Sequence, residues 1–396
     1  MSTEAIPLNY ASKPDAVDSG GVFAPTPGKP RRMHYGDAIR IFGTIAVVIG
    51  HMADMRFGGR PLDRDWWVAN FWDAFTRWAV PAYIMLSGAL LLDPVRVEPP
   101  EDFYRKRLGR IGVPLVFWTV LFMWFSVSYT GWAAFQLPED GDKPGQIVHG
   151  WKAAWLLLAV GKPYTHLHFI FRIAGLYFFT PMMRIWLRHT SVRMQFITVL
   201  TALVISSGDS IMNGITGNEP SVFARFVPFV GYYLLGYLLR QTRVSRAGLI
   251  VCWIGFIFTC VTLAVATGVL IKLTGGKVKW YPSIPMILYD FLSPIRIVMA
   301  VCVWLIFVNT FTAPWPASPR AREVVSWWAA TTLGLYLIHP LFREMLYFSK
   351  AWDAGKGVWW PNVWVGIPLS ALIVYVVSLA ATFIIMKVPY LRRIAG

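Results

Sequence analysis

Long apolar runs alternate with short polar or basic segments along most of the 396-residue chain. An α-helix needs about 20 mostly apolar residues to cross a bilayer, whereas strands of a membrane β-barrel show alternating hydrophobicity over about ten residues. The runs are of the first kind, so the pattern predicts an all-α polytopic membrane bundle of about ten transmembrane helices. We expect these helices over residues 37–55, 68–92, 111–130, 166–187, 194–208, 222–239, 248–271, 285–311, 324–346 and 363–386.

The basic residues indicate how these helices are oriented. Lys and Arg are concentrated in alternate connecting segments, and such segments face the cytoplasm, so we expect both termini to be cytoplasmic. Residues 1–33 are rich in Pro, Gly, Ser and Ala without an apolar run, which predicts a flexible cytoplasmic tail before a transmembrane domain at 34–396. Residues 131–165 bear tryptophans but are too broken to cross the bilayer, and they predict an external interfacial or re-entrant segment.

Composition agrees with this class and excludes others. The chain is 56% hydrophobic and only 15% charged, whereas soluble domains are about 25% charged. The net charge of +16 lies in short loops, so it is a topology signal and not a sign of nucleic-acid binding. Cys252, Cys260 and Cys302 all fall within predicted helices, so neither a disulfide framework nor a metal site is expected.

The first predicted helix carries an unusual set of polar residues. Arg40 and His51 are eleven residues apart, which at 100° per residue returns the side chain to within about 20° of its starting direction. The two side chains therefore share a face, about 16 Å apart along the axis. Asp37 and Asp54 fall within the same arc, and the opposite face is apolar. This predicts a polar track, although Arg40 could also extend to the interface and His51 could be a satisfied core histidine.

Ionisable residues recur within the other predicted helices. A charge inside a bilayer is costly and usually faces a cavity or a partner, so a set of this size predicts a shared hydrated cavity. Asp73 and Arg77 are also four residues apart and could neutralise each other. The full set is Asp37, Arg40, His51, Asp54, Asp73, Arg77, His168, Arg172, Asp290, Arg296, His339, Arg343 and Glu344.

His51 is the best candidate for a general base. Histidine titrates near neutral pH and can take a proton from an alcohol in a transition state. Asp54, one turn further along, could orient the imidazole or stabilise its charged form. His339 is a second candidate, but it directly precedes Pro340. A proline leaves a backbone carbonyl without its donor, so His339 could equally serve to bond that carbonyl.

A basic segment follows the second predicted helix. Arg107 and Arg110 are three residues apart, which places both guanidinium groups on one face of an α-helix. Together with Arg105 and Lys106 they could bind a polyphosphate on the cytoplasmic side. The alternative is that they only set the topology, because such clusters are common in inner loops.

Several of these residues resemble the acyltransferase-3 family of integral membrane acyltransferases. The resemblance covers about residues 35–390, and the order and spacing of the motifs carry it more than any single motif does. His168 departs from the pattern, which favours Trp at that position. The matching stretches are Asp37-Ala-Ile-Arg40 with His51, Val80-Pro-Ala-Tyr-Ile-Met-Leu-Ser87-Gly88, Tyr104-Arg-Lys-Arg107-Leu-Gly-Arg110, Leu176-Tyr177 with Pro181, Gly231 to Gly236, and Gly334-Leu-Tyr336-Leu-Ile-His339-Pro340.

The resemblance implies an enzyme of the bacterial inner membrane that moves an acyl group, most often acetyl, from cytoplasmic acyl-CoA to a hydroxyl of a glycan or lipid-linked sugar at the outer side. It implies His51 as catalytic base, Arg40 as donor-positioning residue, and Arg107 and Arg110 as ligands of the CoA phosphates. Arg40 or another donor would stabilise the oxyanion. No metal is implied.

On the acceptor side we place Asp54 and a further set of polar residues, inferred from their predicted depth in the bilayer. We expect contacts with membrane lipid but not with nucleic acid, and nothing in the pattern specifies an oligomeric state. The alternative function is a proton-coupled or passive transporter of a glycan or anionic metabolite, with His51 as a proton relay. The further acceptor-side candidates are His168, Arg172, Asp73, Arg77 and His339.

Overall fold

A computed structural model provides the structure of the chain. It describes residues 33–57, 62–95, 98–131, 133–136, 147–216, 226–275, 284–313, 315–316, 318–348 and 362–396. Residues 34–396 form one compact unit. The predicted cytoplasmic tail over residues 1–33 lies outside the described residues except for Met33.

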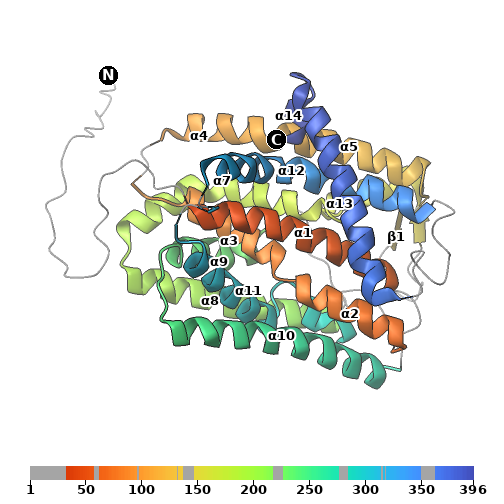
Figure 1. The fold of residues 1–396 in the computed structure, drawn as a ribbon, viewed down its shortest axis with the longest axis horizontal. Helices are drawn as coiled ribbons and strands as arrows, with labels where there is room; N and C mark the ends of the chain where they lie inside the picture. The colour runs from red at the N-terminus through yellow and green to blue at the C-terminus, as the bar shows by residue number, and fades with distance from the viewer. Residues whose placement is uncertain are drawn as a thin grey trace, which may run out of the picture. The chain divides into compact units, whose positions relative to one another are not determined.

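The described part of this unit is helical apart from one short hairpin, as the all-α prediction requires (Figure 1). Its elements are α1 (His34–Phe57), α2 (Arg64–Thr76), α3 (Ala79–Leu91), α4 (Pro100–Arg107), the π-helix η1 (Leu108–Gly112), α5 (Val113–Ser128), β1 (Ala134–Gln136), β2 (Ile147–His149), α6 (Gly150–Ala159), α7 (His168–His189), α8 (Val192–Thr216), η2 (Val227–Phe229), α9 (Val230–Leu238), α10 (Arg246–Leu273), η3 (Ile284–Tyr289), α11 (Pro294–Thr310), α12 (Pro319–Phe348), α13 (Val363–Lys387) and α14 (Arg392–Ala395).

Seven helical segments among the described residues are long and apolar enough to cross a membrane, which indicates a multi-pass membrane protein. All ten predicted spans coincide with helical segments, but α7 and α12 carry internal charges and α9 is short. The count of about ten and the orientation of the termini stay predictions. The seven segments are His34–Met55, Arg64–Leu91, Pro100–Ser128, Val192–Ile215, Arg246–Leu273, Ile284–Thr310 and Val363–Lys387.

Two predicted spans are interrupted. The run over 68–92 divides into α2 and α3 at Arg77 and Trp78, and the run over 285–311 divides into η3 and α11. At the second break the Leu292 amide donates to Asp290 Oδ1 at 2.9 Å. Irregular backbone at membrane depth persists only where protein or a hydrated cavity supplies its hydrogen bonds. The breaks therefore mark where polar groups gather.

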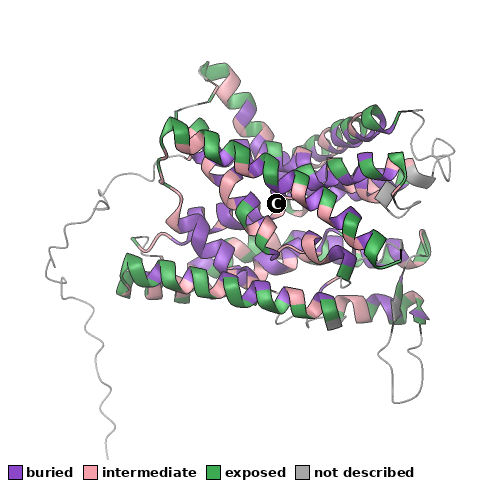
Figure 2. Ribbon diagram, turned by 90° about the horizontal axis from the view of Figure 1, so that it is seen from below, coloured by how far each residue is buried: buried purple, intermediate pink, exposed green. Residues whose placement is uncertain are grey.

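Helix α1 lies in the middle of the unit and packs against α2, α3, α11, α12 and α13 (Figure 1). Figure 2 shows how exposed residues concentrate on the outer helices. On α10, for example, Ile254 and Phe258 are both more than 60% exposed, which suits a lipid-facing surface. Phe42 is the one exposed residue on α1 among its described side chains, so the apolar face of α1 contacts protein more than lipid.

Helices α3 and α9 cross so closely that the contact requires glycine. A Cβ atom built on Gly88 would lie 1.8 Å from the Tyr233 carbonyl oxygen, and one on Gly236 would lie 2.0 Å from the Met85 carbonyl oxygen. Small residues permit this backbone approach between membrane helices. Two glycine motifs about 150 residues apart in the sequence thus form the two sides of one helix crossing.

The segment predicted to be external, 131–165, forms a hairpin followed by α6 in its described part. Strands β1 and β2 pair antiparallel, with Ala134 opposite His149. Helix α6 buries Ala153 and Ala154 and exposes Trp151 and Trp155, a one-sided pattern typical of an interfacial helix. The chain then leads through Thr165 into α7 and so reaches the centre of the unit.

Candidate functional site

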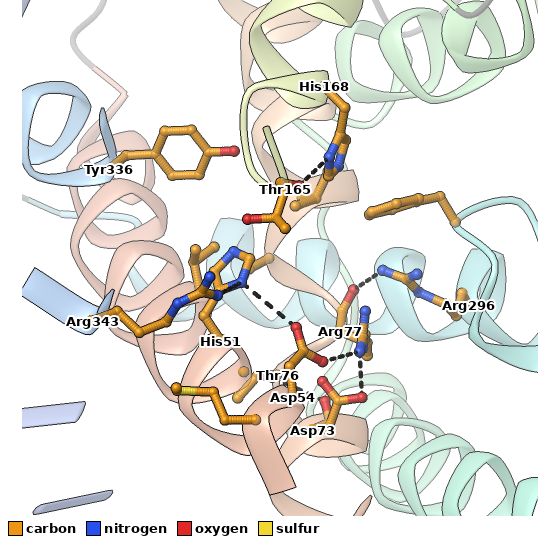
Figure 3. A pocket seen from close by; sticks show the side chains of 16 residues that line it. His51, Asp54, Asp73, Thr76, Arg77, Thr165, His168, Arg296, Tyr336 and Arg343 are labelled. Carbon is orange, nitrogen blue, oxygen red and sulfur yellow. Dashed lines mark hydrogen bonds and ion pairs between the residues drawn. The ribbon is translucent and has the colours of Figure 1, made fainter. Parts of the chain in front are cut away.

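A cavity of about 610 Å³ lies beside the second half of α1 (Figure 3). It is large enough for a small ligand. Five regions of the chain meet around it, including the break between α2 and α3 and the break before α11. Its lining residues are Val47, Gly50, His51, Asp54, Met55, Asp73, Thr76, Arg77, Ala79, Val80, Thr165, His168, Phe291, Arg296, Tyr336 and Arg343.

His51 lies on the α1 wall of this cavity, and two opposite charges flank its Nδ1 atom. Asp54 Oδ2 is 3.6 Å away, and Arg343 Nη1 is 3.4 Å away. The His51 side chain is 18% exposed, so a ligand in the cavity can reach the ring. The predicted pairing of His51 with Asp54 on successive turns of one helix is present.

Asp54 also belongs to a larger ionic network. Arg77 Nη2 donates to Asp54 Oδ1 at 2.9 Å and to Asp73 Oδ2. The predicted i,i+4 pair of Asp73 and Arg77 is therefore confirmed, and a second carboxylate shares its guanidinium. Asp73 is 1% exposed, and a buried charge of this kind needs such a partner. Arg77 fixes Asp54 at the distance from which it can orient His51.

Arg296 completes this side of the cavity by bonding backbone carbonyls at both helix breaks. Its Nη1 donates to the Tyr289 carbonyl at 2.7 Å, and its Nη2 donates to the Arg77 carbonyl at 2.6 Å. Pro81 lacks the amide that would otherwise bond the Arg77 carbonyl four residues earlier. Because buried carbonyls need donors, Arg296 replaces the missing amide and stabilises the break.

His168 and Arg172, both predicted on the acceptor side, differ in position. His168 lines the cavity, and its Nδ1 is 2.7 Å from the Thr165 carbonyl. A carbonyl only accepts, so Nδ1 carries the proton and Nε2 is the acceptor. Arg172 is buried, with its guanidinium carbon 4.5 Å from the ring centres of both Phe229 and Phe291. Arg172 does not line the cavity, and its position favours a packing role.

His339 lies behind His51, with 5.3 Å between the ring centres. It is fully buried, and its Nδ1 is 2.7 Å from the Tyr336 carbonyl. That carbonyl lies four residues before Pro340, so the imidazole provides the donor that the proline removes. This contact is the one expected if His339 serves to bond the carbonyl that Pro340 leaves without a donor. His166, buried and 5.6 Å from the His339 ring, extends this group of imidazoles.

Arg343 and Glu344 form a buried pair next to His51. The Nε and Nη2 atoms of Arg343 both donate to Glu344 Oε1, the first at 3.0 Å. Glu344 is fully buried and Arg343 is 7% exposed. With this pair included, the charges at the cavity balance. Three arginines (Arg77, Arg296 and Arg343) face three carboxylates (Asp54, Asp73 and Glu344).

The other end of α1 has different surroundings. Arg40 Nη1 donates to Asp37 Oδ1 at 2.9 Å, and Arg40 is 30% exposed. Its backbone carbonyl accepts from Tyr83 at 2.8 Å. Arg40 and His51 share one helix as predicted, but Arg40 does not line the cavity around His51. Arg110 is among the charges that act on Arg40, so the basic segment approaches this end of α1.

The Arg107 and Arg110 pair does not lie in a regular α-helix. Arg107 ends α4, and Arg110 lies within the π-helix η1. A π-helical turn is wider than an α-helical one, so the one-face geometry expected at a spacing of three does not apply. Arg107 is half-buried with its guanidinium 5.3 Å from the Phe103 ring centre, and Arg110 is exposed. π-helical turns are frequent at functional sites.

Sequence reasoning missed part of the site. It did not single out Thr165, Tyr336 or Thr76 as cavity residues, and it gave His166 no role. These residues carry no charge at physiological pH or sit in a loop, so hydrophobic patterning had no reason to select them. Pro81 and Pro340 were the features of the sequence that could have indicated the site. Each leaves a backbone carbonyl without its amide donor, and a buried side chain must then bond that carbonyl.

Comparison with known proteins gives one match. The acyltransferase-3 family model, described as an acyltransferase domain, matches residues 33–387, which is most of the chain. No curated protein and no solved structure matches the chain significantly. The match includes α1, the helix breaks, the η1 segment and the Arg343–Glu344 pair.

Proposed function

Because the chain belongs to the acyltransferase-3 family, we propose that it transfers an acyl group, most simply acetyl, from cytoplasmic acyl-CoA to a hydroxyl group. The acceptor is a glycan or lipid-linked sugar at the outer side of a bacterial inner membrane. The observation that carries this proposal is the position of His51 in a cavity, with Asp54 beside its Nδ1 atom.

The arrangement supports His51 as the general base. A proton on Nδ1 directed toward Asp54 leaves the Nε2 lone pair free to accept a proton. The acceptor hydroxyl oxygen then bonds to the thioester carbonyl carbon as its proton moves to Nε2. When the carbon–sulfur bond breaks, the CoA thiolate recovers that proton from His51. Asp54 stabilises the imidazolium between these two steps.

The donor approaches from the Arg40 end of α1 in this proposal. Arg107 and Arg110 bind the CoA phosphates through their guanidinium groups, and Arg40 positions the extended arm between them and the cavity. Arg40 and His51 are about 16 Å apart along α1, a span that the arm covers as an extended chain. The partly exposed guanidinium of Arg40 and the exposed Arg110 are consistent with this path.

The acceptor enters the cavity from the opposite end. With the buried Glu344 included, the charges around the cavity balance, which favours a neutral polar ligand, such as a sugar hydroxyl, over a strongly anionic one. His168 lines the cavity there, and Asp54 is partly exposed. Asp73 and Arg77 also line this part of the cavity, and Arg77 positions Asp54 by bonding both carboxylates.

The test is acetyl-CoA turnover by the purified protein in detergent. Wild type should bind acetyl-CoA and release CoA, and His51→Ala should lower turnover by about 10²–10⁴-fold, the contribution of a general base. Arg107→Ala/Arg110→Ala should weaken binding. His149→Ala is the control, since His149 belongs to strand β2 outside the cavity. Wild-type activity in folded His51→Ala would disprove the assignment of the base.

One observation favours a second candidate function. Broken helices around a central cavity are also typical of secondary transporters, and both α2–α3 and η3–α11 are broken there. A transporter of glycans or small anions predicts substrate flux into liposomes without acyl-CoA. Flux without acyl-CoA, together with no turnover at millimolar acetyl-CoA, would replace the acyltransferase proposal.

A further inference from the structure

We propose that Arg343 is a second catalytic residue of the cavity. Its Nη1 group donates hydrogen bonds to the acyl carbonyl oxygen when that oxygen becomes negatively charged. The inference rests on the proposed acyl transfer at His51 and adds a residue that the α1 motif does not include. Arg40, the first candidate for this task, lies about 16 Å from His51 along α1.

The hydrogen bonds of Arg343 direct Nη1 toward the base. Nε and Nη2 are both held by Glu344 Oε1, which leaves Nη1 as the part of the fork beside His51, 3.4 Å from its Nδ1 atom. Figure 3 shows the guanidinium next to the imidazole at the edge of the cavity. The buried Glu344 carboxylate therefore fixes a cation within reach of the reacting atoms.

The tautomers of His51 explain how Nη1 becomes available. A guanidinium only donates, so Arg343 can bond Nδ1 only when Nδ1 carries no proton. Asp54, on the other side of Nδ1, requires the opposite tautomer. His51 can act as a base through Nε2 only in the tautomer that points Nδ1–H at Asp54. In that state Nη1 loses His51 as its acceptor, and an oxygen in the cavity replaces it.

The other two arginines that line the cavity bond other groups. Arg77 is shared by Asp54 and Asp73, and Arg296 bonds two backbone carbonyls. Neither has a described contact with His51. Arg343 thus has the position that an oxyanion donor needs, because such a donor must be fixed before the charge develops.

Arg343 acts while the tetrahedral intermediate forms and breaks down. The hydroxyl oxygen bonds to the carbonyl carbon, its proton moves to His51 Nε2, and the carbonyl electron pair moves onto oxygen beside Arg343 Nη1. The carbon–oxygen double bond then reforms, the carbon–sulfur bond breaks, and the thiolate takes the proton from His51. The products are an ester and free CoA.

The experiment measures kcat and KM for acetyl-CoA in Arg343→Gln, Arg343→Lys and Arg343→Ala. Loss of one oxyanion donor should lower kcat by about 10²–10³-fold with little change in KM, and Lys should retain more activity than Gln. Added guanidinium should restore part of the Arg343→Ala turnover, which a purely structural role would not produce. If Arg343→Gln folds poorly, the turnover of Arg343→Ala with and without guanidinium still tests the role of Arg343.

Arg184→Gln is the matched control. Arg184 is buried on α7 and pairs with Glu98 at 3.6 Å, so its loss also removes an arginine beside a glutamate, away from the cavity. It should keep kcat within about threefold of wild type. A Gln variant with wild-type kcat, or an Arg343→Ala loss that guanidinium leaves unchanged, would refute the role of Arg343. An inactive wild type would instead refute the proposed function itself.

Discussion

The two ends of α1 carry the same kinds of residues in very different surroundings. Near its start, Asp37 and Arg40 pair with each other on one turn, and Arg40 is 30% exposed. Near its end, Asp54 and His51 meet Arg77 and Arg343 from two other helical regions around a cavity. A polar pair within one turn is a local arrangement, whereas a site requires groups brought together by the fold.

This difference predicts a large catalytic asymmetry between the two aspartates. Asp54→Asn should lower kcat by about 10²-fold or more, because an amide can present its NH₂ group to Nδ1 and favour the tautomer that blocks Nε2. Asp37→Asn should leave kcat near wild type at saturating acetyl-CoA. Steady-state kinetics of both variants measure the asymmetry, and equal kcat losses would show that the comparison is wrong.

Buried and exposed ion pairs should also differ in how much they contribute to the free energy of unfolding. Arg77→Ala leaves the 1%-exposed Asp73 without its partner, and loss of one member of a buried pair costs about 3–5 kcal/mol. Arg77→Ala/Asp73→Asn should recover part of that loss. The control is Arg105→Ala, since Arg105 is 81% exposed in its pair with Asp102 and should change stability by less than about 1 kcal/mol.

Thermal unfolding in detergent measures all three variants. If Arg77→Ala unfolds at the same temperature as Arg105→Ala, the ionic network around Asp54 does not stabilise the fold. In that case the network would have to act on His51 alone, and the Asp54→Asn kinetics would be the remaining way to detect it.

A substitution at the Arg40 end of α1 should change acetyl-CoA binding more than the chemical step. In the proposed function Arg40 contacts the acyl donor both before and during the reaction, so in Arg40→Ala the KM for acetyl-CoA should rise by about tenfold with a smaller change in kcat. Thr44→Val, which removes the neighbouring hydroxyl that bonds the Arg40 carbonyl, is the control and should leave KM unchanged. A fall in kcat without a rise in KM would move Arg40 from donor binding to the chemical step.

The sequence predicted the helical membrane class and the approximate positions of the ten apolar segments, because apolar runs of about 20 residues are a strong signal. It also placed His51 with Asp54 and Asp73 with Arg77, since helical spacing fixes such pairs. It did not predict the breaks that divide α2 from α3 and η3 from α11. Nor could spacing show that Arg343 reaches His51, because that contact depends on how α12 packs against α1.

Irregular backbone and aromatic packing account for two further differences between the prediction and the structure. The spacing of Arg107 and Arg110 predicts neighbouring positions on one face of an α-helix, but a π-helical turn changes their relative directions. Arg172, predicted on the acceptor side, packs between Phe229 and Phe291 and does not line the cavity. Helical periodicity gives the direction of a side chain only where the helix is regular. It does not show whether a cationic side chain reaches a cavity or packs against aromatic rings.

The smallest expected effect concerns the partly exposed pair that Lys106 of the basic segment forms with Glu98. Lys106 donates to Glu98 at 2.7 Å and lowers the pKa of that carboxyl below its usual value of 4.5, with Arg184 and Arg107 acting in the same direction. Because the folded-state pKa is the lower one, the pair should stabilise the protein fully above about pH 4.5. That stability should be lost as the pH falls through the depressed pKa.

Glu98→Gln should therefore lower stability by less than about 1 kcal/mol at pH 7 and should have no effect at a pH below the depressed pKa. Thermal unfolding of wild type and Glu98→Gln across this pH range measures the difference, and salt should reduce it. A difference that persists at low pH would mean that Glu98 acts through packing and not through its charge. The difference in stability loss between the Asp73 and Glu98 pairs would then come from contact geometry more than from burial.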